Sequence, residues 1–408
     1  MGSNRPLRVL IEGASMDPAW QGGDPVYAEL LVRGLGQLGV DAVREGSRRT
    51  FVEFAALALT PYDAEPSRIL WYRRRLRGLR PNVVLASTDY DCSLIVAARK
   101  EGIPVIVVVQ IYWPTCPIGT RYIEGRGVCS TPGFSKCLRH MSRAPISPNL
   151  GLPVPGLPAP LGFVLYSKLW VRRAALSQAD AIVAPSEFMA TVLREAGYPR
   201  VHVIPNSVDT NLFRASPWEG PSKVVLYPVA RSKQERKGYD HFVRMARAVH
   251  AKMPDVRFRI LTDPGDDLIE GTSYLSHAEL AEQLRAIYLA VVPGLWDEPF
   301  GTVAAEAMSA GRPVVMYDGG GSSDLIEDGV SGLLVPRGDV VGLARAVGGL
   351  LADEDKAHRM GQAARARIEA RFRYPMMAER YLALIYEVLG GRRPDSVAPG
   401  RPSTCVPS

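Results

Sequence analysis

Long apolar runs and cysteine are both scarce in this sequence. No uninterrupted apolar stretch approaches the roughly 20 residues that a membrane-spanning helix needs. The apolar run at 7–11 is too short for a secretory signal and fits a first buried strand. These absences predict a globular protein of the cytoplasm, where the five cysteines among 408 residues would not form disulfides.

A nucleic-acid recognition motif is also missing, because basic residues are not interleaved with exposed aromatic ones. The chain is nevertheless basic, with 49 Lys and Arg against 42 Asp and Glu, a net charge of +7 and a pI near 9.2. This excess favours an anionic ligand or surface. The densest basic cluster consists of Arg73, Arg74, Arg75, Arg77 and Arg80. We interpret it as a solvated helix face; docking on an anionic membrane is the alternative and is not favoured.

Short apolar runs alternate with helical patterns along the chain, as in parallel α/β proteins. The length suffices for two such domains. The expected buried strands of the first are 7–11, 83–86, 105–109 and 181–184, with a helix at 27–38. Those of the second are 224–229, 257–261, 286–292, 313–316 and 332–335.

We expect the first domain at 1–205, with a Cys- and Pro-rich insertion at 112–161, and the second at 206–372. A further helix is expected at 373–390. The tail at 391–408 is rich in Pro, Arg, Gly and Ser without periodicity, which predicts disorder.

The segment 296–315, W-D-E-P-F-G-T-V-A-A-E-A-M-S-A-G-R-P-V-V, carries the most chemistry. It follows an apolar strand, so Glu298 should emerge at the carboxyl end of a parallel sheet, where such sheets bind ligands. The amides of 300–303 would open a helix and offer donors to an anion. Glu306, two turns on, could reach a hydroxyl. The pattern suits a nucleotide-sugar, although an acidic turn before an ordinary amphipathic helix is the alternative.

The whole string E-P-F-G-T-x-A-x-E-A-M-x-A-G-x-P-V-V resembles the donor-site motif of the retaining glycosyltransferases of family 4. The segment 206–213, N-S-V-D-T-N-L-F, resembles a second signature of that family, with Ser207 in place of its glycine. The resemblance implies the GT-B fold, an α/β architecture in which two Rossmann-like domains face each other across a cleft. It also implies that a C-terminal helix crosses back to the first domain.

The resemblance assigns roles to the donor-site residues. Glu298 would hydrogen-bond the donor sugar, and Phe300, Gly301 and Thr302 would place amides on sugar and phosphate. Glu306 would hold the ribose hydroxyls, an arrangement that suits a carboxylate.

Two further elements of the resemblance concern the donor diphosphate. Arg231 and Lys237 would bind it, which agrees with the charge that grows on the leaving group. Gly22 and Gly23 would form a loop that approaches it closely, although a Gly pair at a strand-to-helix turn is by itself more typical of a plain turn.

The sequence departs from the family at Gln110, which stands where the family often has a histidine facing sugar and acceptor. A glutamine can donate and accept hydrogen bonds but cannot act as a base near neutral pH. Asp324 likewise takes the place of a glutamate after a Gly-rich turn.

The insertion contains Cys116, Cys129, Cys137 and His140, which could form a tetrahedral structural zinc site. The alternative is a mobile acceptor loop with unpaired thiols. The Pro-rich run 144–160 extends this insertion and is expected over the mouth of the cleft.

The resulting hypothesis is a retaining glycosyltransferase that moves a sugar from a nucleotide diphosphate, with UDP expected, to an acceptor hydroxyl. No Asp-x-Asp metal clamp occurs in a fitting position, so we expect catalysis without a metal cofactor. A small natural-product aglycone or aminocyclitol is the preferred acceptor; lipid carriers and polysaccharides stay open, as does the oligomeric state. The alternatives are a nucleotide-sugar-binding protein without turnover, indicated by Gln110 alone, and a sugar-nucleotide epimerase.

Overall fold

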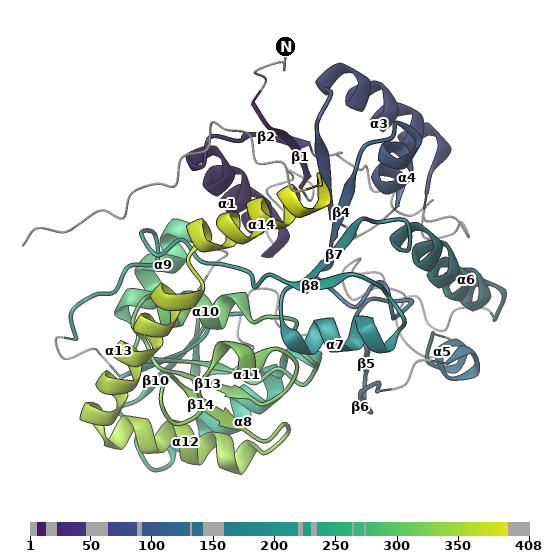
Figure 1. Cartoon of the computed structure of the whole chain (residues 1–408). Helices are drawn as coiled ribbons and strands as arrows, with labels where there is room; N and C mark the ends of the chain where they lie inside the picture. The colour runs from purple at the N-terminus through teal and green to yellow at the C-terminus, as the bar shows by residue number, and fades with distance from the viewer. Residues whose placement is uncertain are drawn as a thin grey trace, which may run out of the picture.

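Two parallel six-stranded sheets with helices on their faces make up the protein (Figure 1). The structure is a computed structural model that describes residues 6–13, 23–45, 64–87, 92–130, 133–141, 159–218, 223–229, 235–262, 265–272 and 275–390. The tail at 391–408, predicted to be disordered, lies outside these residues. Among the described helices, none is long and apolar enough to cross a membrane.

The N-terminal sheet has the strand order β2-β1-β3-β4-β7-β8. Alternate residues of its strands enter two separate hydrophobic clusters, so both faces are buried, as parallel sheets require. Its strands are β1 (Arg8–Glu12), β2 (Asp41–Glu45), β3 (Val83–Ser87), β4 (Val105–Val108), β7 (Ala181–Ala184) and β8 (Val201–Val203). The helices of this half are α1 (Gly23–Gln37), α3 (Pro66–Leu79), α4 (Ser93–Lys100), α5 (Phe134–Met141), α6 (Ala159–Leu176) and α7 (Glu187–Glu195).

The C-terminal sheet repeats this plan with the order β11-β10-β9-β12-β13-β14. Its strands are β9 (Val224–Tyr227), β10 (Arg257–Ile260), β11 (Ile269–Gly271), β12 (Leu289–Val292), β13 (Val314–Tyr317) and β14 (Leu333–Val335). Its helices are α8 (Tyr239–His250), α9 (His277–Ala286), α10 (Thr302–Ser309), α11 (Ser322–Leu325), α12 (Val340–Ala352) and α13 (Glu354–Arg371), with a 3-10 turn η2 (Glu235–Lys237). In each sheet the strand order runs first toward one edge and then toward the other, and it changes between β1 and β3 and between β9 and β12. At such a point a crevice forms at the carboxyl ends of the strands.

The last helix, α14 (Tyr374–Val388), leaves the C-terminal half and packs against α1 of the N-terminal half (Figure 1). Contact is close because α1 carries Gly34, where an added Cβ would lie 2.6 Å from the Cβ of Ala378. Arg33 stacks 4.9 Å from the ring of Tyr374 and pairs with Asp209 at 2.6 Å. The predicted two-domain α/β architecture with a returning helix is therefore confirmed.

The basic cluster on α3 is largely engaged in ion pairs. Arg73 and Arg77 both contact Glu101, and Arg75 makes a two-pronged contact with Glu45. Much of the positive charge is thus matched locally, which supports the interpretation of this helix as a solvated face.

Candidate active site

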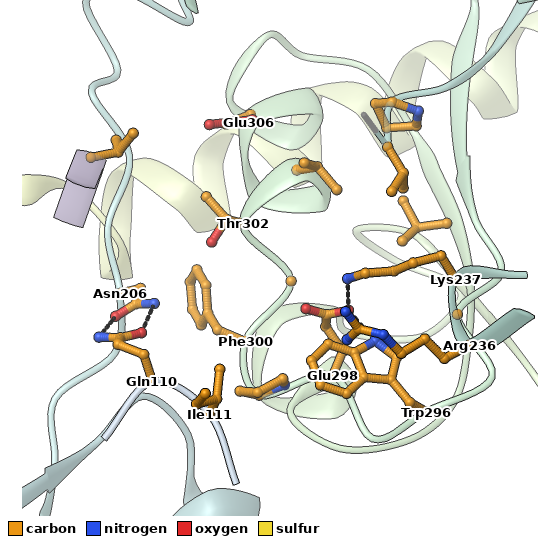
Figure 2. Close-up of a pocket in the computed structure, with 18 of the residues that line it drawn as sticks. Gln110, Ile111, Asn206, Arg236, Lys237, Trp296, Glu298, Phe300, Thr302 and Glu306 are labelled. Atoms are coloured by element: carbon orange, nitrogen blue, oxygen red, sulfur yellow. Dashed lines mark hydrogen bonds and ion pairs between the residues drawn. The ribbon is translucent and has the colours of Figure 1, made fainter. Parts of the chain in front are cut away.

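A cavity of about 410 Å³ lies where the carboxyl ends of β4, β9 and β12 meet, and it is lined by both halves of the chain. The N-terminal half contributes Gln110 and Asn206, and the C-terminal half contributes Lys237, Glu298 and Glu306 (Figure 2). Residues nearly 200 positions apart thus line one cavity. The crevice expected from the strand order is the site of the cavity.

Glu298 follows β12, as its position after an apolar strand predicted, and its carboxylate is held from two sides. Oε2 accepts a hydrogen bond from Trp296 Nε1 at 2.7 Å and lies 3.3 Å from Lys237 Nζ. The backbone carbonyl of Glu298 accepts a hydrogen bond from Gly321 N at 2.7 Å. An added Cβ on Gly320 would collide with the Glu298 backbone, so only glycine fits there. The Gly-rich turn at 319–321 therefore supports Glu298.

Lys237 lies at the end of η2 and points toward Glu298 (Figure 2). Burial lowers the pKa of its ammonium, and the charge of Glu298 opposes that shift. Its carbonyl accepts a hydrogen bond from Tyr227 OH at 2.9 Å. The next residue, Gly238, has φ +78° and has no room for a side chain beside the Pro293 carbonyl. These contacts constrain the backbone from which the Lys237 side chain extends toward Glu298.

Arg236 adds a second cation that the sequence interpretation did not single out. Its guanidinium lies 4.7 Å from the Trp296 ring centroid, and Lys237 Nζ lies 4.6 Å from the same centroid. Both contacts are in the range of cation–π attraction. Adjacency to Lys237 in the sequence was the available signal, since both belong to one short turn. Trp296 therefore organises two cations and the Glu298 carboxylate.

The start of α10 faces the cavity, as predicted. Its N-cap residue is Gly301, at φ +95°, which provides no side-chain cap, and Gly301, Thr302 and Val303 line the cavity. The first amides of a helix have no partner within the helix. They combine with the helix dipole to favour an anion. Phe300 is buried, and its ring packs 5.6 Å from that of Phe372, so it anchors this turn.

Glu306 lies deeper in α10 and is only 4% exposed. Burial raises the pKa of its carboxyl to about 8, with no other cause. A carboxyl group with this pKa is mostly protonated near neutral pH. Its position at the far end of the lining from Glu298 leaves the helix start between the two acids (Figure 2).

Gln110 follows β4 at the cavity wall, where the sequence predicted it. Its amide forms a reciprocal pair with Asn206: Gln110 Nε2 donates at 3.0 Å and Asn206 Nδ2 donates back at 2.7 Å (Figure 2). Both residues are buried. Asn206, from the N-S-V-D segment, therefore holds the Gln110 side chain in one orientation.

Three of the remaining predicted positions cannot be placed in the cavity. Arg231 and Gly22 lie outside the described residues, and Gly23 is described only as the first residue of α1. Their contacts with a diphosphate stay predictions. Asp324 accepts a hydrogen bond from Glu187 N at 2.8 Å, so it links the C-terminal half to the start of α7.

The cysteines of the insertion gather beside a small hairpin, β5 (Tyr122–Ile123) and β6 (Gly127–Val128). Cys116, Cys129 and Cys137 are all buried and free of disulfides. Burial raises the pKa of the Cys137 thiol, and the other two thiols raise it further because they lie nearby. Within the described part of the chain, no three His, Cys, Asp or Glu residues are arranged to hold a metal ion. Cys116, Cys129 and Cys137 lie within that part and form no such group, and the His140 side chain lies outside it, so zinc binding by these four residues stays a prediction.

Two family models match separate parts of the chain. The model described as Glycosyltransferase Family 4 matches residues 22–212, and the one described as Glycosyl transferases group 1 matches residues 223–353. Together they contain both walls of the cavity.

Among curated proteins, the α-maltose-1-phosphate synthase of Mycolicibacterium smegmatis is 31% identical over 54% of this chain and 66% of its own length. The D-inositol 3-phosphate glycosyltransferase of Nocardia farcinica is 32% identical over 53% of this chain and 55% of its own length. The alignments thus span about half of this chain and somewhat more of these relatives.

Among solved structures, sucrose-phosphate synthase from Thermosynechococcus elongatus has a TM-score of 0.68 at 18% identity, covering 95% of this chain and 100% of that one. HepE of Anabaena, in complex with UDP and glucose, has a TM-score of 0.62 at 16% identity, covering 93% and 99%. These similarities show the GT-B fold. The chain belongs to glycosyltransferase family 4.

Proposed function

We propose that the protein transfers a glycosyl group from a UDP-sugar to an acceptor hydroxyl with retention of anomeric configuration. The order of groups along the cavity supports this proposal most directly. Glu298 with its cation lies at one end, the α10 start in the middle and Glu306 at the other end (Figure 2). Sugar, diphosphate and ribose of a nucleotide-sugar follow the same order. HepE, of the same fold, is described in complex with UDP and glucose, so we prefer UDP as the nucleotide of the donor.

In the proposed reaction the bond between the sugar C1 and the phosphate oxygen breaks, and a bond from C1 to the acceptor oxygen forms on the same face. The acceptor proton passes to the departing phosphate oxygen. Lys237 and the α10 amides stabilise the charge that grows on the diphosphate. Gln110 orients sugar or acceptor hydroxyls without acting as a base. We assign the same diphosphate role to Arg231, Gly22 and Gly23, and we propose that no metal takes part in the chemistry.

A small polyhydroxylated acceptor, such as a cyclitol or a natural-product aglycone, is the class we favour. The name of the Nocardia relative identifies an inositol phosphate as its acceptor, which supports a cyclitol here. The cavity also has the amide pair Gln110–Asn206 on the acceptor side, and amides suit neutral hydroxyls.

The decisive experiment is thermal unfolding of the purified protein with UDP, GDP, ADP, TDP and their sugar conjugates, with Glu306→Ala measured in parallel. We expect a selective rise in Tm with UDP and UDP-sugars that the variant loses. A selective rise with another base would replace UDP in the proposal.

Turnover is tested separately. NMR of the product formed with a cyclitol should show the anomeric configuration of the donor. Nucleotide binding without transfer or slow donor hydrolysis would instead favour a binding protein without turnover, the alternative that the engaged amide of Gln110 permits.

A further inference from the structure

The β5–β6 hairpin of the N-terminal half reaches across the cleft and holds the turn that carries the two cations. Tyr122 OH donates to Glu235 Oε1 at 2.8 Å. Gly125 N, at the hairpin tip, donates to both carboxylate oxygens at 2.9 and 3.0 Å. We infer that Glu235 is a positioning residue, through which this hairpin sets the place of Lys237 over the donor diphosphate. This inference rests on the proposed function.

Glu235 lies in a three-residue turn whose backbone carbonyls are hydrogen-bonded. Glu235 is the first residue of η2, and its carbonyl accepts from Gly238 N at 2.9 Å. The carbonyl of Arg236 accepts from Leu295 N at 2.8 Å. Only one residue separates Glu235 from Lys237, so a shift of the η2 backbone at Glu235 moves the backbone of Lys237 as well.

The hairpin is itself anchored at its base. Arg121, at φ +50°, donates from Nε to the Cys129 carbonyl at 3.3 Å and from Nη2 to the Ser130 carbonyl at 2.9 Å. Its guanidinium lies 5.4 Å from the ring centroid of Tyr112, which packs edge-on against Trp296 at 6.3 Å. Because its base is fixed to the N-terminal half, the hairpin holds Glu235 of the C-terminal half at a defined position.

Tyr122 is shielded enough for this contact to matter. Tyr122 is 4% exposed, and burial together with the hydrogen bond to Glu235 raises the pKa of its phenol. The hydroxyl therefore stays protonated and able to donate across the physiological pH range. Hydrogen bonds to a charged acceptor are the stronger class.

The test is a double-mutant cycle with Tyr122→Phe, Glu235→Ala and the double variant. Each single change should lower kcat/KM for the donor by about five- to ten-fold, through loss of hydrogen bonds to a charged group. The double variant should be no worse than Glu235→Ala, because both changes remove one interaction. Glu235→Gln, which keeps an acceptor oxygen, should recover part of the loss. Glu124→Gln, an exposed acid at the same tip, is the matched control and should behave as wild type.

Hydrogen exchange of the 235–238 segment provides a readout that does not need turnover. Faster exchange in Tyr122→Phe would demonstrate the contact even if the wild type transferred no sugar, in which case only the proposed function fails. Multiplicative kinetic effects, or unchanged exchange in an active enzyme, would overturn the inference.

Discussion

Lys237 and Glu298 are coupled at the scale of single residues, because one carboxylate oxygen serves both Lys237 and Trp296. We expect Lys237→Ala to lower kcat by about two orders of magnitude, since it removes a cation that we propose stabilises the leaving diphosphate. Steady-state kinetics with UDP-sugar and acceptor measure this. Lys252→Ala, an exposed lysine outside the cavity, is the control. Turnover near that of the wild type in Lys237→Ala would contradict the donor-site assignment.

Glu298→Ala should also cost about two orders of magnitude in kcat, because we propose that the carboxylate orients the donor sugar in the transition state. Glu298→Gln, which keeps a hydrogen-bond acceptor of the same shape, should retain more activity than the alanine variant. Equal rates for both variants and the wild type would remove Glu298 from the proposed site.

Glu306 makes stability depend on pH in a direction that can be worked out. Its carboxyl has a pKa of about 8 in the folded protein, above its ordinary value of 4.5, so the folded state binds the extra proton between these limits. The free energy of unfolding of the nucleotide-free protein therefore falls as pH rises from about 4.5 to 8.

Glu306→Gln should remove this loss, so its gain in Tm over the wild type should be larger at pH 8 than at pH 5. Differential scanning calorimetry at both pH values measures it, with the exposed Glu379→Gln as control. A gain that does not change with pH would mean that Glu306 titrates normally.

At the scale of elements, Gly34 is the point where α1 and α14 meet. A methyl group there would press on Ala378, so Gly34→Ala should lower the free energy of unfolding by about 1–3 kcal/mol. Gly36 lies on the same helix with open space around it, so Gly36→Ala should be neutral or stabilising by up to about 1 kcal/mol. Denaturant unfolding of the Gly34→Ala and Gly36→Ala variants measures both free energies and so distinguishes the effect of packing from that of helix propensity. Equal effects of both substitutions would argue against a tight contact.

The insertion supplies a prediction about metal content. The set of Cys116, Cys129, Cys137 and His140 predicts about one zinc per chain, measured by elemental analysis of purified protein. Cys137→Ser should lower that content and the Tm, whereas Cys405→Ser should change neither. Purified protein that contains no zinc, together with a Cys137→Ser variant as stable as the wild type, would contradict the zinc site and leave the three buried thiols as core residues.

The sequence predicted the central strands and the edge strand β14, but it missed the edge strands β2, β8 and β11. Central strands such as β4 and β12 are buried on both faces, so they appear as uninterrupted apolar runs. β2 and β11 lie at the sheet edges and contain Asp41, Arg44 and Glu270. Their polar residues interrupt the pattern, because edge strands need not be apolar throughout. The hairpin β5–β6 escaped prediction because each strand has only two residues.

At the scale of the whole molecule, the place of Glu298 and Glu306 at the carboxyl end of a parallel strand could be predicted from sequence, because both belong to one continuous segment. Glu298 through Glu306 belong to one strand-turn-helix unit, whose geometry follows from local rules. The contacts across the cleft were not readable. Tyr122 and Glu235 pair across the cleft from 113 positions apart, and only the packing of the two halves brings them together. Gln110 and Asn206 are 96 positions apart and pair within the N-terminal half, where the order of strands in its sheet brings them together.

The returning helix α14 has a consequence for biosynthesis. Tyr381, Ile385 and their neighbours complete one face of the N-terminal core, yet they are among the last described residues that a ribosome would add. During translation the N-terminal half therefore keeps an apolar face exposed until the second half and α14 have been synthesised. A nascent chain stalled before residue 374 should accordingly be held by chaperones through its N-terminal half, the half that was synthesised first.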